Sequence, residues 1–144
     1  MTNKWEFTRQ TKAPVTRAID YFMHVENLPK VHPEFVKSVT VKSTEGDSVV
    51  FEQQMEMMKR RIVSQNKLNL NRQENKIVID TFEGDGKGSK ITMSLKPLPD
   101  GGTELNYVAE MELGPLGFFA KGPAKSAMEK VTLEDAKNLD AAAM

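Results

Sequence analysis

The sequence predicts a single α+β domain over residues 1–144: a curled, seven-stranded antiparallel sheet wrapped around a long C-terminal helix, with two short helices after the first strand. Three observations favour this fold. The length of 144 residues suits one ordinary domain. Apolar and polar residues alternate with period two in segments separated by short turn signals, and the C-terminal region changes to helical spacing.

Residues 5–11 predict the first strand, because the apolar Trp5 and Phe7 alternate with polar residues. Pro14 then suits the first turn of a helix, and apolar residues at helical spacing extend it to about Val25. Pro29 and Pro33 limit the next segment to a single helical turn. The strand is therefore followed by two short helices.

Strand-like patterns then recur over residues 36–43, 48–58, 61–71, 76–83, 89–97 and 103–113. The segments between them, such as 45–47 and 99–102, are short and rich in Gly, Asp and Asn, which is typical of hairpin turns. Consecutive strands joined by such turns form an antiparallel meander. We expect the run 84–90 to be one of these turns, because it leads into a strand and lacks the ending of a phosphate-binding loop.

Residues 116–139 predict the long helix, because apolar residues gather near one stripe that also includes Asp135. A helix of this length reaches about 30 Å, enough to cross a sheet. Gly122 and Pro123 predict that the regular helix begins at Pro123 after a short turn. The alternative is a lid formed by Leu116, Phe118 and Phe119 that moves to admit a ligand.

The composition excludes several classes of function. Lys plus Arg is 20 and Asp plus Glu is 20, so no net positive charge favours nucleic acid or an anionic membrane. The absence of cysteine excludes disulfides, thiolate nucleophiles and iron–sulfur clusters. The N-terminal residues lack the apolar run of a signal peptide, and we find no integral membrane segment. We therefore expect a cytoplasmic protein.

Four segments resemble a known superfamily: Ala13-Pro14-Val15, residues 26–30 followed by His32-Pro33, residues 101–107, and the C-terminal helix. On these the chain resembles the START-related, or SRPBCC, superfamily of polyketide cyclases and dehydrases, lipid-transport domains and pollen-allergen-like proteins. The resemblance implies the helix-grip fold and a small hydrophobic ligand, such as a lipid, isoprenoid, quinone or polyketide, between sheet and helix. It leaves two alternatives: a cyclase or dehydratase enzyme, and an accessory protein that docks on a larger complex, as implied by relatives associated with carbon monoxide dehydrogenase.

Strand parity predicts which side chains face the interior, because the apolar-rich face of each strand is the buried one. Methionines are frequent on this face, and a few polar groups accompany them. Flexible thioethers would adapt to apolar guests, and polar groups would orient them. The alternatives are that the methionines fill an irregular core and that the polar groups meet water at strand ends or in a bulge. The predicted ligand-binding residues are Phe51, Gln53, Met55, Met57, Ser64, Asn66, Leu68, Ile79, Met93, Tyr107, Ala109, Met111, Phe119 and Met128.

The sequence contains no catalytic or metal-binding motif. The interior face offers Tyr107 as its titratable group, with Arg9 near the rim, so we assign no catalytic residue. His24 and His32 lack further ligands at metal-binding spacing, and we expect His24 to pair with Asp20 on the surface. We therefore predict no metal and no cofactor. Residues 59–61 are expected to form a charged turn and no nucleic-acid patch, while a protein partner is left open.

Overall fold

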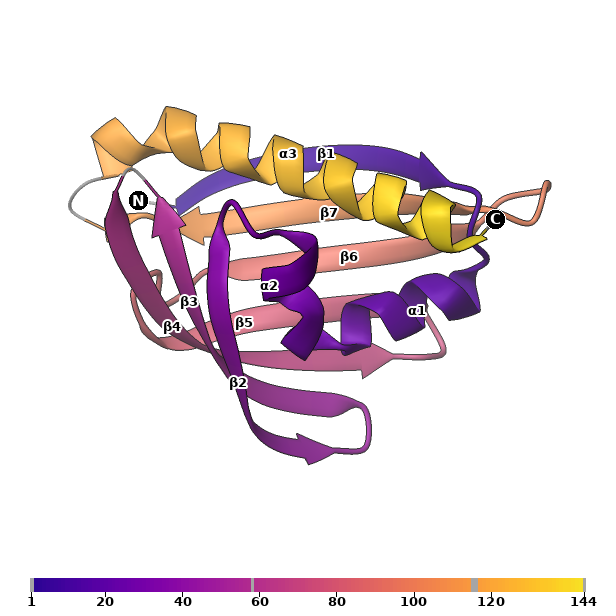
Figure 1. The fold of residues 1–144 in the computed structure, drawn as a ribbon, viewed down its shortest axis with the longest axis horizontal. Helices are drawn as coiled ribbons and strands as arrows, with labels where there is room; N and C mark the ends of the chain where they lie inside the picture. Colours follow the sequence, from indigo (N-terminus) through magenta and orange to yellow (C-terminus); the bar gives the residue numbers. More distant parts are fainter. Residues whose placement is uncertain (1, 58, 115–116, 144) are drawn as a thin grey trace.

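The computed structural model describes residues 2–57, 59–114 and 117–143 and has the predicted α+β architecture (Figure 1). The elements follow in the predicted order. They are β1 (Thr2–Thr11), α1 (Val15–Met23), a short 3-10 helix η1 (Val25–Asn27), α2 (Leu28–Val31), β2 (Val36–Glu45), β3 (Ser48–Met57), β4 (Arg60–Asn71), β5 (Lys76–Gly84), β6 (Lys90–Pro97), β7 (Thr103–Glu112) and α3 (Gly117–Ala143).

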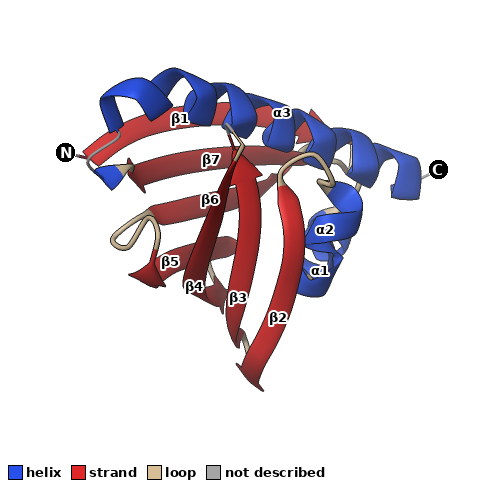
Figure 2. Cartoon of the chain, turned by 60° about the vertical axis from the view of Figure 1, so that its left-hand side comes forward, coloured by secondary structure: helices blue, strands red, loops and turns tan. Residues whose placement is uncertain are grey.

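One antiparallel sheet has the strand order β1-β7-β6-β5-β4-β3-β2. The chain crosses between its two edge strands, β1 and β2, through α1 and α2. Figure 2 shows the consequence of the curl: β2, β3 and β4 run steeply across the direction of β1 and β7, while α3 lies along β1. Register shifts in β2 and in the β4–β5 pair help to bend the sheet.

The strand registers confirm the predicted inner face. Phe51 pairs with Asn66, and Met93 pairs with Tyr107, so the side chains of each pair share the concave side. The core beneath α3 contains large side chains with almost no exposed surface. They include Phe51, Leu68, Ile77, Leu105 and Leu139.

Helix α3 is attached most closely to β1. The Arg9 guanidinium Nε donates to Thr132 Oγ1 at 3.2 Å, midway along the helix. Near the C-terminal end, the Asp140 carboxylate accepts from Thr11 Oγ1 at 2.6 Å and from the Lys12 backbone N–H at 2.7 Å. The second half of α3 also packs against α1 and α2 (Figure 1), so its first half has less helical support.

One sequence expectation needs correction. The helix does not begin at Pro123: it begins at Gly117 and contains Pro123 in its interior. Pro123 is exposed, so water can solvate the carbonyl that its missing N–H leaves unpaired. On the edge strand β2, Val41 shares the inner face with its partner Phe51, yet the residue is 39% exposed because it lines a groove.

The predicted lid falls where the structure gives no description. Leu116 lies outside the described residues, and so do the side chains of Phe118 and Phe119. The lid therefore stays a prediction, and so does a docking role for these three residues.

Candidate functional site

A groove of about 350 Å³ opens where the first half of α3 passes the end of β3. The segment after α2 contributes Glu34 and Phe35, and β3 contributes Met57. The helix contributes Pro123, Ser126, Ala127 and Lys130. Lys130 Nζ lies 3.4 Å from Glu34 Oε1, so an exposed ion pair joins the helix to the segment after α2.

A second groove, of about 450 Å³, opens at the other end of β3. Its walls are the C-terminal end of α1 and the adjacent ends of β2 and β3, and it is lined by Met23, His24, Glu26, Val41, Thr44 and Val49. The inner face of β3 therefore runs from Val49 in one groove to Met57 in the other. Phe51, Gln53 and Met55 lie between them on that face.

The predicted ligand-binding residues share the inner face but differ in burial. Seven of them are buried: Phe51, Ser64, Asn66, Leu68, Met93, Tyr107 and Ala109. Six are only partly buried: Gln53, Met55, Met57, Ile79, Met111 and Met128. The side chain of Phe119 is outside the described part. Most of the partly buried group lies toward the ends of β3 and β7, on the side where α3 begins.

Three polar residues of the inner face form a directed chain of hydrogen bonds. Thr81 Oγ1 donates to Asn66 Oδ1 at 2.7 Å, and Asn66 Nδ2 donates to Ser64 Oγ at 3.0 Å. The Ser64 and Asn66 side chains are buried, so these bonds replace lost hydration. A bulge does occur beside Asn66, as one alternative expected, but Ser64 and Asn66 meet each other there.

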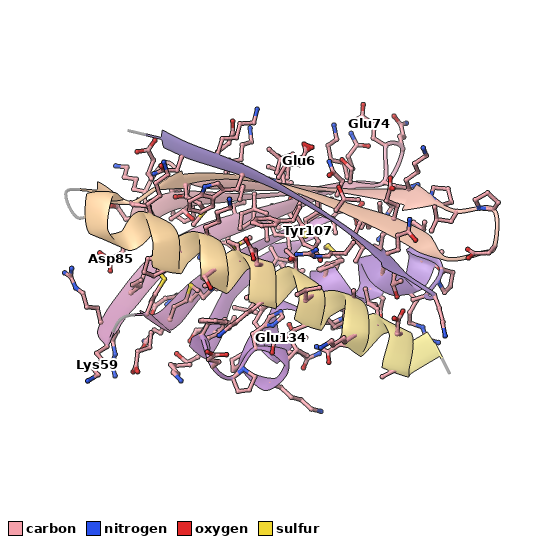
Figure 3. The ribbon with its side chains drawn as sticks, turned by 90° about the horizontal axis from the view of Figure 1, so that it is seen from above. Glu6, Lys59, Glu74, Asp85, Tyr107 and Glu134 are labelled. Carbon is pink, nitrogen blue, oxygen red and sulfur yellow. The ribbon has the colours of Figure 1, made fainter. Side chains whose placement is uncertain are left out.

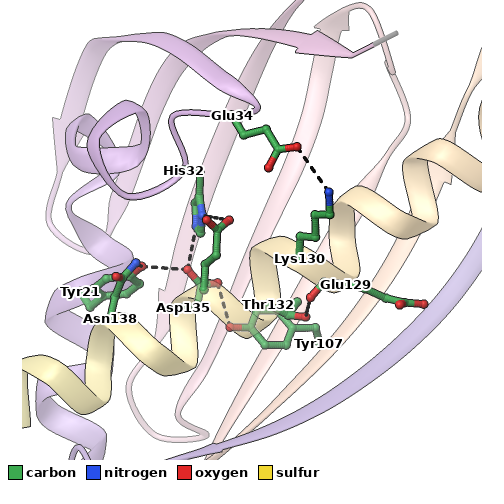
Figure 4. Close-up of polar contacts among 10 residues, drawn as sticks. Tyr21, His32, Glu34, Tyr107, Glu129, Lys130, Thr132, Asp135 and Asn138 are labelled. Atoms are coloured by element: carbon green, nitrogen blue, oxygen red, sulfur yellow. Dashed lines mark hydrogen bonds and ion pairs between the residues drawn. The ribbon is translucent and has the colours of Figure 1, made fainter.

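A second polar cluster lies under α3 and centres on the buried carboxylate of Asp135 (Figure 4). Its Oδ1 accepts from Tyr21 Oη at 2.9 Å and lies 2.8 Å from His32 Nε2. Its Oδ2 accepts from Tyr107 Oη at 2.9 Å. The cluster thus ties α1, the end of α2 and β7 to α3. Seen from above in Figure 3, Tyr107 lies beside the helix that it contacts.

The charges in this cluster set its protonation. Burial, together with the Asp135 charge, raises the pKa of Tyr107 well above its ordinary value, so its hydroxyl remains a donor. Burial lowers the pKa of His32, but the hydrogen bond and charge of Asp135, helped by Glu134, outweigh burial and raise it overall. Glu134 Oε1 lies 3.2 Å from His32 Nδ1. The two carboxyl groups that contact the ring therefore favour the protonated form of His32.

Sequence reasoning missed this cluster, although one signal was present. Asp135 lies on the otherwise apolar stripe of the long helix, and a carboxylate in that position needs buried partners. His32 gave no such signal, because it precedes a proline in an irregular segment. The surface pair was predicted correctly: His24 Nδ1 lies 3.6 Å from Asp20 Oδ1, and both side chains are exposed. Among the described residues, no group of three or more His, Asp or Glu side chains could hold a metal.

Solved structures share this fold over nearly the whole chain. TTHA0849 from Thermus thermophilus is 18% identical, with a TM-score of 0.82 over 98% of this chain and 97% of that one. The ZhuI aromatase/cyclase from Streptomyces sp. R1128 is 13% identical, with a TM-score of 0.81 over 99% and 94%. A START superfamily protein from Mycobacterium smegmatis is 19% identical, with a TM-score of 0.75 over 94% and 98%. These likenesses confirm the helix-grip fold.

No curated protein matches the sequence. Within the described part of the chain, no helix has the length and apolar character needed to cross a membrane. A model of the family described as polyketide cyclase/dehydrase and lipid transport matches residues 3–143. The chain therefore belongs to the polyketide cyclase/dehydrase and lipid transport family.

Proposed function

We propose that this protein binds a small hydrophobic molecule, such as a lipid, isoprenoid, quinone or polyketide, between the inner face of the sheet and α3. One observation carries the proposal: inner-face apolar side chains, including Met55, Met57 and Met111, remain only partly buried on the side where α3 begins. A completed core would bury them fully. The first groove, to which Met57 contributes, is the proposed entrance.

The side chains at this end suit a guest of variable shape. Met55, Met57, Met111 and Met128 have unbranched thioether side chains that can repack around different apolar surfaces. For a ligand of about 20 heavy atoms at roughly 0.3 kcal/mol each, the dissociation constant would be on the order of tens of micromolar. The family, which includes lipid-transport members by its description, supports the same class of function.

The test uses protein labelled with ¹³C at the methionine methyl groups and titrated with the neutral dye Nile red. We expect the signals of Met55, Met57, Met111 and Met128 to shift with one common dissociation constant. Single Met→Leu variants would assign each signal, and leucine preserves most of the side-chain volume. The dye's fluorescence, recorded in parallel, gives the same constant independently.

Met23 provides the internal control, because it lines the second groove and not the first. A shift confined to Met23 would place the dye in the second groove and contradict the proposed site. Saturable fluorescence with no shift at any inner-face methionine would contradict it as well. Native mass spectrometry of the purified protein would add the mass of any molecule that it retains.

A second candidate, a cyclase or dehydratase acting on a polyketide-like substrate, is favoured by the contact of Tyr107 with Asp135 and, through it, with His32. These groups can hold and exchange protons, and Tyr107 also lies on the inner face. Under this candidate, Tyr107→Phe would abolish turnover of such a substrate while leaving its binding largely intact. An unchanged rate would remove Tyr107 from the mechanism.

A further inference from the structure

The strands β3 and β4 place two side chains with unused hydrogen-bonding capacity side by side on the inner face. Gln53 and Ser64 are direct cross-strand partners, so their side chains project from the same side of the sheet. The Gln53 side chain is partly buried, and no described residue hydrogen-bonds its amide. A half-buried amide without a protein partner is available to a ligand.

The hydrogen-bond chain behind Ser64 fixes what that side chain can offer. Because Asn66 Oδ1 accepts from Thr81, the Asn66 amide is oriented with its nitrogen toward Ser64 Oγ. Ser64 Oγ is thus an acceptor in this chain, and no described residue accepts its hydroxyl hydrogen. Each bond of such a chain polarises the next, so the hydroxyl is a strengthened donor.

The strand neighbours of this pair on the inner face carry no charge. Its neighbours on the inner face are Val39, Phe51 and Met55. The cations at this end lie farther out. Lys59 and Lys130 line the first groove, where Lys130 is paired with Glu34 and Lys59 points outward in Figure 3. Arg60, at the end of β4 opposite Met57, is exposed. A carboxylate held at Gln53 and Ser64 would lose hydration with no cation among these neighbours to offset the loss. A neutral carbonyl would lose far less hydration free energy, and it would accept hydrogen bonds from both Gln53 and Ser64.

We propose that Gln53 and Ser64 form the polar end of the ligand site and that they select an uncharged hydrogen-bond acceptor, such as the carbonyl of a ketone, quinone or ester, over a carboxylate. This inference rests on the proposed function and names the chemical class of its ligand. Tyr107, which the sequence placed in the same site, is not needed for this role, because its hydroxyl donates to Asp135.

The test compares three fluorescent probes of one shape. They are 6-propionyl-2-(dimethylamino)naphthalene, which carries a ketone; its propyl analogue, which lacks the oxygen; and 6-(dimethylamino)-2-naphthoate, which carries a carboxylate. Each is titrated into the wild-type protein and into a Gln53→Met/Ser64→Ala variant. We expect the double substitution to lower the affinity for the ketone probe by roughly three- to tenfold. The affinity for the propyl analogue should stay unchanged or increase.

Gln54→Met is the matched control. Gln54 is the adjacent residue on the opposite face, where its amide donates to Glu52 Oε1, so its loss should change the affinity of none of the probes. The wild-type protein also supplies a readout that needs no variant. The emission of the ketone probe shifts to the red when its carbonyl accepts a hydrogen bond, and we expect bound probe to show that shift.

Three results would overturn the inference. Equal effects of the double substitution on the ketone and the propyl analogue would show that the two groups do not recognise the oxygen. Emission typical of a dry, unbonded carbonyl in the wild-type complex would show the same. Tighter wild-type binding of the naphthoate than of the ketone would reverse the selectivity. In these cases the proposed binding function still stands, whereas failure of all three probes to bind would count against both.

Discussion

His32 Nε2 lies 2.8 Å from Asp135 Oδ1, and the two side chains that meet there are 1% and 5% exposed. This contact joins the end of α2 to the middle of the long helix. Tyr21 and Tyr107 donate to the same carboxylate from α1 and β7. A buried ion pair of this kind adds little net stability over an apolar contact, but removing one partner leaves the other charge uncompensated.

Substitution of His32 should therefore destabilise the fold strongly. We expect His32→Ala to lower the free energy of unfolding by about 3 kcal/mol, near the low end for a broken buried pair, because the two tyrosines still satisfy Asp135. Urea unfolding would measure the loss. His24→Ala is the control: its exposed pair with Asp20 should contribute no more than about 0.5 kcal/mol. Similar losses for both variants would contradict the structural role of His32.

The same contact makes stability depend on pH. The pKa of His32 is raised in the folded protein, so the folded state holds a proton that the unfolded chain releases near pH 6.5. The resulting stabilisation is fully present below that pH and is lost as pH rises through the folded-state pKa. Unfolding midpoints measured from pH 5.5 to 9 should fall over this window in the wild-type protein.

Two measurements isolate the contribution of His32 to this pH dependence. His32→Gln should flatten most of the fall, whereas His24→Gln should flatten less of it, because His24 is exposed although its pKa is also raised, chiefly by the Asp20 backbone carbonyl. An NMR titration of the imidazole signals reads each pKa directly. A His32 pKa below 6.5 would mean that burial outweighs the two carboxylates, and it would reverse the predicted slope.

The two tyrosines of the cluster should differ in importance. Tyr107 is the donor to Asp135 Oδ2, whereas Tyr21 shares Oδ1 with His32. We expect Tyr107→Phe to reduce the free energy of unfolding by about 2 kcal/mol and Tyr21→Phe by about 1 kcal/mol, both measured by urea unfolding. The reverse order would indicate that the Asn138 bond to the Tyr21 hydroxyl matters more than the second carboxylate oxygen.

The fold was predictable because the sequence patterns that indicate its strands and turns are local. Alternation within each strand placed Phe51, Met93 and Tyr107 on one face, and turn residues separated the strands, so the order of elements and the inner face followed. The start of α3 was not predictable in this way. A proline ends most helices. Pro123 is tolerated inside α3 because it is exposed, and that position is known only from the tertiary structure.

The candidate site was predictable in part, for a similar reason. Parity identified Gln53, Ser64 and Asn66 as inward polar residues, but it could not say which of their hydrogen bonds are met inside the protein. That answer depends on the β4–β5 register, which brings Thr81 to Asn66. The Asp135 cluster joins residues more than 100 positions apart, and no local pattern encodes such a contact.

The β4–β5 bulge also makes one glycine indispensable. Gly84 has a φ of +85°, and a Cβ atom there would lie 2.5 Å from the carbonyl oxygen of Val63. That oxygen cannot move freely, because it accepts a hydrogen bond from the Asp85 backbone N–H at 2.9 Å. Gly84→Ala therefore combines a left-handed backbone with a clash against fixed main chain.

Gly101→Ala separates these two contributions. Gly101 has a similar φ of +91°, but a Cβ atom there would meet nothing within 4 Å. We expect Gly101→Ala to cost about 1 kcal/mol, the strain of the left-handed backbone alone, and Gly84→Ala to cost at least about 3 kcal/mol. Urea unfolding of the two variants measures the difference. Equal losses of unfolding free energy in the two variants would mean that the hairpin between β5 and β6 can shift away from β4 without penalty. The bulge would then not fix the register that brings Thr81 to Asn66.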